Sequence, residues 1–115
     1  MTDSPQDQPE RRDSPRVPYR AYATLTTTSH HYPVHIVDLS FNGALAALIE
    51  PHGLIAGDEV TLNIDLEEGA PIKMTGTLAH QEQHYLGVEC HSNSPETQSR
   101  LRELLKEQNE EISKR

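Results

Sequence analysis

Four arginines lie close together near the start of a chain that is otherwise acidic. They are Arg11, Arg12, Arg16 and Arg20, and the next basic residue is Lys73. The same leading stretch holds equally many acidic side chains, so the formal net charge of −8 comes entirely from residues 21–115. A guanidinium is a planar, permanently charged fork that fits phosphate oxygens and the O6/N7 edge of guanine. The arginines therefore indicate capture of an anion, and the alternative is that they are simply solvated.

A second polar group, DLSFNG at residues 38–43, follows an extended segment. Residues two apart on a strand point the same way, so Asp38 and Ser40 can face one edge of a ligand. Gly43 permits a positive φ or a close approach between backbone and ligand. An Asx or Ser turn between two strands explains the same residues without any ligand.

The hydrophobic pattern predicts six strands followed by one helix. Extended segments are expected at residues 21–29, 34–39, 43–50, 60–65, 72–80 and 85–91. Short strands with short connections favour a closed antiparallel barrel, which leaves no exposed sheet edge. Ser94 and Pro95 then form a favourable helix start, and the apolar period changes to that of a helix. The predicted fold class is all-β: a six-stranded antiparallel β-barrel with a C-terminal helix from about residue 95.

The length and composition predict one domain with two loose ends. A chain of 115 residues that is 34% hydrophobic and lacks Trp can bury one modest aliphatic core. Residues 1–16 are rich in proline and charge without periodicity, which predicts a flexible N-terminal arm. Residues 17–108 would form the barrel and helix, and residues 109–115 a frayed tail. A monomer is favoured, with the oligomeric state left open.

The composition also argues against several classes of partner and location. The acidic balance disfavours general DNA or RNA binding, which needs many cationic contacts. The longest apolar run, residues 44–49, is too short to cross a membrane, so no membrane insertion is expected. A single cysteine excludes an internal disulfide, and no signal segment is apparent, so a cytoplasmic protein is expected.

Neither catalysis nor metal binding is indicated by the motifs. No serine lies in a nucleophile elbow, and no phosphate-cradling glycine loop precedes a helix. The histidines are scattered without the local spacing of metal ligands. Cys90 alternates with Leu86 and Val88 on one strand face and is expected in the core. We therefore expect no enzyme and no cofactor; a metal-dependent or cysteine-based enzyme is kept as a third hypothesis.

Taken together, the motifs resemble the PilZ domain family, bacterial receptors for the second messenger cyclic di-GMP. The resemblance is carried by Arg12-x-x-x-Arg16 and Asp38-x-Ser40-x-x-Gly43. It is supported by Val17-Pro18, by GDEV at residues 57–60 and by LGVEC at residues 86–90, and it covers roughly residues 11–108. Arg16 and Arg20 have the same spacing, but Arg20 lies at the start of the first strand, so the earlier pair is preferred. Asn42 stands where many members have glycine.

The resemblance implies a set of contacts to cyclic di-GMP. They involve Arg11, Arg12, Arg16, Asp38, Ser40, Gly43 and His80. The arginine pair would grip phosphates and guanine Hoogsteen edges, while Asp38 and Ser40 would contact guanine from the barrel surface. His80 falls where some relatives stack an aromatic ring on guanine; a plain exposed histidine is the alternative interpretation.

The implied function is a single-domain cyclic di-GMP receptor. The arm would close over one nucleotide, or two stacked ones, and a separate unidentified protein would read the altered surface. The alternative is a ligand-independent adaptor of the same family that acts through protein–protein interactions, for example in surface motility machinery. The arginine pair discriminates between them, because members without nucleotide binding commonly lack it.

Overall fold

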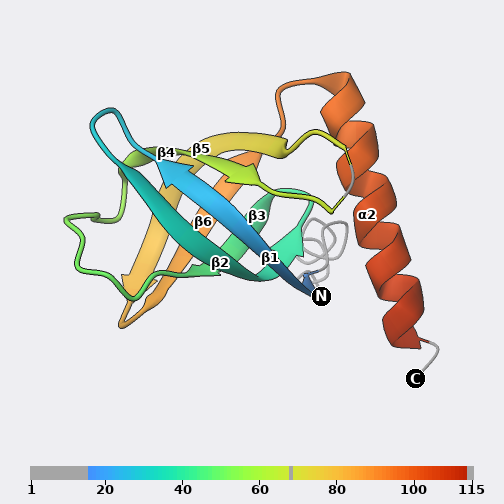
Figure 1. The fold of residues 1–115 in the computed structure, drawn as a ribbon, viewed down its shortest axis with the longest axis horizontal. Coiled ribbons are helices and arrows are strands. Elements are labelled where there is room, and N and C mark those ends of the chain that lie inside the picture. The colour runs from blue at the N-terminus through green and yellow to red at the C-terminus, as the bar shows by residue number, and fades with distance from the viewer. Residues whose placement is uncertain (1–15, 68, 114–115) are drawn as a thin grey trace, which may run out of the picture.

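Six strands close into an antiparallel barrel in the order β1-β2-β3-β6-β5-β4 (Figure 1). The computed structural model describes residues 16–67 and 69–113. The strands are β1 (Val17–Thr26), β2 (His31–Ser40), β3 (Gly43–Ala47), β4 (Glu59–Ile64), β5 (Ile72–Glu82) and β6 (Tyr85–His91), followed by the helix α2 (Pro95–Ser113). The predicted fold class is therefore confirmed.

The strand boundaries depart from the predicted ones mainly at hairpin ends. β1 begins at Val17 instead of residue 21, and it ends at Thr26 instead of residue 29. Thr27 Oγ1 accepts hydrogen bonds from the amides of Ser29 and His30, which closes the turn before the predicted strand end. β3 likewise ends at Ala47 instead of residue 50. β6 has the predicted boundaries, residues 85–91.

An aliphatic core fills the barrel, as the composition indicated. The largest fully buried side chains are Leu25, Ile36, Leu39, Leu62, Ile64, Ile72, Met74, Leu78, Leu86, Leu101, Val34 and Val88. Cys90 belongs to the same cluster, and its Sγ lies 4.0 Å from Met74 Sδ. The prediction that Cys90 is a core residue is confirmed.

α2 is capped and anchored at its N-terminal end. Ser94 Oγ accepts a hydrogen bond from the Thr97 amide at 3.4 Å, which is the predicted N-cap. Leu101 is fully buried in the barrel core. On either side of it, Arg100 donates to the Ala70 carbonyl and the Arg102 guanidinium lies 4.9 Å from the centre of the Phe41 ring. The partly buried Leu104 and Leu105 also pack against the core, so the helix docks on the barrel through its first three turns.

The two chain ends were predicted to be loose. Arg11 and Arg12, with the rest of the predicted arm up to residue 15, lie outside the described residues. α2 extends to Ser113, beyond residue 108, where the sequence predicts that helical order ends. Fraying of residues 109–115 stays a prediction.

Three β-bulges interrupt the strand pairing at one level of the barrel. The register shifts between Pro18 and Ala21 in β1, between Ile36 and Asp38 in β2, and between Leu78 and His80 in β5. A bulge inserts one residue and so changes the face that the following side chains occupy. Because Ile36 and Leu78 are buried, regular pairing would also turn Asp38 and His80 inward. The bulges instead place both side chains outside.

Candidate functional site

One transverse row of residues crosses the outside of β2, β3, β6 and β5. Asp38 pairs with Leu45, Leu45 with Gly87, and Gly87 with His80. Two of the predicted contact residues, Asp38 and His80, therefore stand on the same face of the barrel at opposite ends of this row. We call this surface, from Asp38 to His80 together with Arg16 and Gly43, the arginine face.

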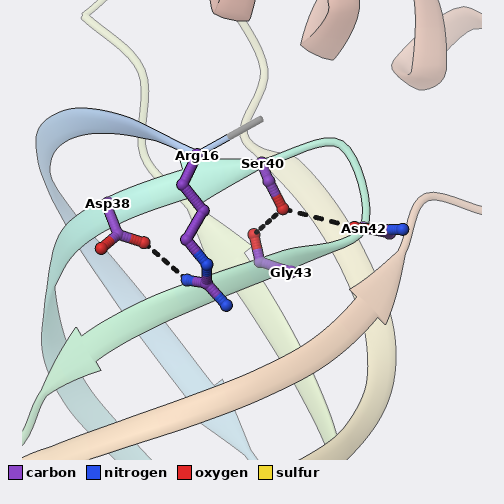
Figure 2. Close-up of polar contacts among 5 residues, drawn as sticks. All are labelled: Arg16, Asp38, Ser40, Asn42 and Gly43. Atoms are coloured by element: carbon purple, nitrogen blue, oxygen red, sulfur yellow. Dashed lines mark hydrogen bonds and ion pairs between the residues drawn. The ribbon is translucent and has the colours of Figure 1, made fainter. Parts of the chain in front are cut away.

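Arg16 reaches across the arginine face from the residue just before β1. Its Nη1 donates to Asp38 Oδ1 at 2.6 Å (Figure 2). The side chains are 50% and 24% exposed, so both groups stay accessible to a ligand. A charge-assisted bond of this length fixes the direction of the guanidinium fork. Within residues 16–67 and 69–108 it is the one ion pair.

Gly43 lies beneath the Arg16 guanidinium. A Cβ at Gly43 would be 3.8 Å from Arg16 Nη2 and 2.9 Å from the Val88 carbonyl oxygen. The glycine does not have a positive φ, which among the described glycines occurs at Gly57 and Gly69. The sequence offered two reasons for a glycine here, a positive φ and a close approach. The close approach applies, and the approaching group is the backbone of β6. Because Gly43 has no side chain, the Arg16 guanidinium can lie close to the backbone of β3.

Ser40 is turned into the β2–β3 connection. It is buried, and its Oγ donates to the Gly43 carbonyl at 3.2 Å or to Asn42 Oδ1 at 3.4 Å (Figure 2). The Ser-turn interpretation therefore describes this hydroxyl, whose bonds hold the turn in which Gly43 lies. A direct contact between Ser40 and a ligand stays a prediction.

The imidazole of His80 covers Gly87. A Cβ at Gly87 would lie 2.6 Å from Nδ1 and 2.7 Å from Nε2 of the ring, closer than atoms can approach. The ring thus occupies the space where a side chain at residue 87 would stand, and it is exposed on its outer side. Leu45 and Gly87 were not among the predicted contacts. The glycine of LGVEC was the available signal, but its role depends on a ring from the neighbouring strand.

A third residue that the sequence did not indicate is Glu89. It pairs with Gly43 across β3 and β6 and is exposed. Its carboxylate adds an acceptor at the edge of the arginine face. The alternative arginine, Arg20, instead lines a groove between β1 and α2. The structure thus separates Arg20 from the group formed by Arg16, Asp38 and Gly43.

The electrostatic setting of Cys90 does not suit a nucleophile. Burial raises the pKa of its thiol to about 12, and the positive charge of Arg16 offsets part of that rise. The thiolate, which is the reactive form, is therefore scarce near neutral pH. Over the described part of the chain, no group of three His, Cys, Asp or Glu side chains could hold a metal ion. No helix in that part is both long and apolar enough to span a membrane.

Comparison with known proteins identifies the fold. The model of the PilZ domain family matches residues 10–107. No curated protein matches the sequence. The chain is similar in structure to the PilZ domain with c-di-GMP of YcgR from Escherichia coli, with a TM-score of 0.70, 16% identity, and coverage of 90% of this chain and 95% of that one.

A second similar structure is that of the Bacillus subtilis inhibitor of motility, MotI/DgrA. The TM-score is 0.66 at 15% identity, and the match covers 87% of this chain and 52% of that one. The chain thus spans about half the length of that protein. At these identities both structures show a shared fold.

Proposed function

The chain belongs to the PilZ domain family, and we propose that it is a receptor for cyclic di-GMP, bound between the leading arginine segment and the arginine face. The observation that carries the proposal is the Arg16 guanidinium, held 2.6 Å from Asp38 and directly above Gly43. One nitrogen of the fork is used by the carboxylate, which leaves Nη2 to donate to a ligand beside Gly43. A phosphate oxygen or a guanine Hoogsteen edge fits that position.

The charge distribution supports this role for the arginines. Residues 21–115 carry the whole net charge of −8, so most of the chain repels a dinucleotide that bears two phosphates. Arg12 lies four residues before Arg16 in the motif, so both side chains would approach the same ligand. Arg11 would add a further contact. The leading arginines would supply the cationic contacts to the ligand, although the same stretch carries equally many acidic side chains.

His80 and Asp38 would contact the bases at the two ends of the row. A flat ring over Gly87 offers a stacking platform, and stacking tolerates any purine face. Asp38 accepts hydrogen bonds, so it would complement the amino and imino groups of guanine.

Binding would be coupled to ordering of the arm. A segment with many charges and few apolar side chains gains order when a ligand neutralises its arginines. The closed arm and the nucleotide together would then present a new surface to a separate partner protein. An adaptor that acts without nucleotide is the competing function, and it predicts no binding of cyclic di-GMP.

Isothermal titration calorimetry with cyclic di-GMP tests the proposal. We expect saturable heat with the wild-type chain, a much weaker signal with Arg16→Gln, and a weak signal when cyclic di-AMP replaces cyclic di-GMP. Absence of heat with the wild-type chain would favour the adaptor function. Equal affinity of wild type and Arg16→Gln would remove the arginine face from the binding site.

A further inference from the structure

A groove of about 1240 Å³ separates the outer side of β1 from one face of α2. On the helix side its wall includes Arg100, Glu103, Leu104 and Glu107, whose spacing of three and four residues defines a single helix face. On the barrel side the wall is formed by residues 19–22 of β1 and residues 65–67 after β4. None of the described residues of the arginine face lines this groove, so the two surfaces are distinct.

The groove is open because α2 is anchored at one end. Leu101 is buried in the core, whereas Leu104 is only half-buried, and Glu107 is exposed. Figure 1 shows α2 at the side of the barrel, with its C-terminal half extending away from the strands. At Glu107 the helix therefore faces barrel residues across the groove while its side chain stays exposed.

An exposed aromatic pair lies on the barrel side of this groove. Tyr22 is 67% exposed, and its ring centre is 4.8 Å from that of His35 on the neighbouring strand. Tyr19 lines the groove beside it. Tyrosine has an apolar body and a polar tip, and it is enriched where proteins bind other proteins. These rings offer an anchoring site for an apolar side chain of a partner.

Carboxylates outnumber cations around the rings. The groove is lined by Asp65, Glu67, Glu103 and Glu107, against Arg20 and Arg100. Arg100 already donates to the Ala70 carbonyl, so its charge is partly engaged. Burial raises the pKa of Tyr19, and the nearby negative charge of Glu67 raises it further. A cationic partner would find complementary charge on both walls.

We propose that this groove docks a cationic segment of a partner protein, one that carries Lys or Arg together with an apolar anchor for the tyrosines. The surface is distinct from the arginine face, and binding there does not need the dinucleotide. A second copy of this chain is disfavoured as the occupant because each copy carries a net charge of −8. The chain's own residues 1–15 are also a poor match, because their acidic residues outnumber Arg11 and Arg12.

The test is a titration of the full-length, isotope-labelled chain with defined peptides, followed by amide NMR shifts. The probe is a helical Lys/Leu peptide of about twelve residues, compared with a Glu/Leu and a Lys/Ser peptide of the same length. We expect the Lys/Leu peptide alone to bind, and to shift the amides of Tyr22, His35, Leu104 and Glu107. The variant Glu103→Gln/Glu107→Gln should bind it about fivefold more weakly, the effect of two exposed charge pairs. The control Glu50→Gln/Glu82→Gln removes the same charge elsewhere and should bind like the wild type.

Five results would overturn the proposal. The first is that the Lys/Leu peptide does not bind, and the second is that the amide shifts it causes lie outside the groove. The third is that both double variants weaken binding equally, which would mean that the peptide is attracted by net charge alone. The fourth is that dilution of the protein without peptide shifts the amide signals of the groove, which would make a second copy of the chain the occupant. The fifth is that replacement of Arg11 and Arg12 by glutamine shifts the same amide signals without peptide, which would place the chain's own leading segment in the groove.

Discussion

Arg16 and Asp38 form an ion pair of 2.6 Å that joins the segment before β1 to the bulged end of β2. Both residues belong to motifs that were expected to contact a ligand separately. The structure shows that they also contact each other, so the carboxylate orients the guanidinium before any ligand arrives. Their contributions to binding should therefore be coupled.

A double-mutant cycle on this pair measures the coupling. Arg16→Ala should weaken cyclic di-GMP binding by about 1.5 to 3 kcal/mol, the range for hydrogen bonds to charged groups, and Asp38→Ala by less. The double variant should lose less than the sum, because Asp38 acts partly through Arg16. The free energy of unfolding should change by less than about 1 kcal/mol, since the pair is exposed. Additive losses in calorimetric titrations would show that the ion pair has no part in binding.

Gly43 should be intolerant of any side chain. Gly43→Ala places a methyl group 2.9 Å from the Val88 carbonyl oxygen, so β3 and β6 must move apart. We expect a loss of about 1 to 3 kcal/mol in the free energy of unfolding, measured by urea denaturation. Gly53→Ala is the matched control, because nothing lies within 4 Å of its Cβ position. Equal stability of the two variants would contradict the close approach of the strands.

The platform formed by His80 can be tested from both sides. His80→Ala should weaken cyclic di-GMP binding by about 1 to 3 kcal/mol through lost stacking, and His80→Phe should retain most of the affinity. Gly87→Ala should weaken binding as well, because the new methyl group displaces the His80 ring. It should leave stability nearly unchanged, since an exposed ring can move at little cost. If both His80 variants bind like the wild type, the ring is a plain surface histidine.

The buried thiol predicts a stability loss in alkali. The ordinary pKa of the Cys90 thiol is 9.0, and the folded pKa is about 12. Between these values the unfolded chain releases the thiol proton and the folded chain keeps it, so the free energy of unfolding falls as pH rises through this window.

Cys90→Ala lacks the titrating thiol and provides the reference. From about pH 8 to about pH 10.5 the wild type should lose about 2 kcal/mol more stability than this variant, in urea denaturation at each pH. An equal loss in the two proteins would show that the thiol titrates in the folded state as it does in the unfolded state.

Local chemistry made much of the fold predictable. The placing of Leu86, Val88 and Cys90 on one face indicated β6, and the capping preference of Ser94 indicated the start of α2. The predicted start of β1 is too late because the period-two alternation begins only at residue 21, whereas the strand starts at Val17 and has a bulge between Pro18 and Ala21.

The shape of the site was less predictable, because it depends on strand register. Asp38 faces outward through the bulge between it and Ile36, and a bulge exists only relative to the partner strand. Gly87 acquires its role from the His80 ring, which a bulge in β5 turns outward. The Ser40 side chain is turned inward, where its Oγ donates a hydrogen bond to the Gly43 carbonyl across a tight turn. Neither of the first two relationships is visible in one segment of sequence, whereas the Ser-turn interpretation of residues 38–43 anticipated the third.

The most direct test of the account is the affinity for cyclic di-GMP of the wild type, Arg12→Gln and Arg20→Gln, measured by calorimetry. The two variants lose the same charge from the same stretch of chain, but Arg20 lines the groove beside α2. We predict that Arg12→Gln weakens binding by about 1.5 to 3 kcal/mol, or roughly tenfold or more, whereas Arg20→Gln binds like the wild type. A wild-type chain that gives no binding heat, or variants that bind equally well, would contradict the account.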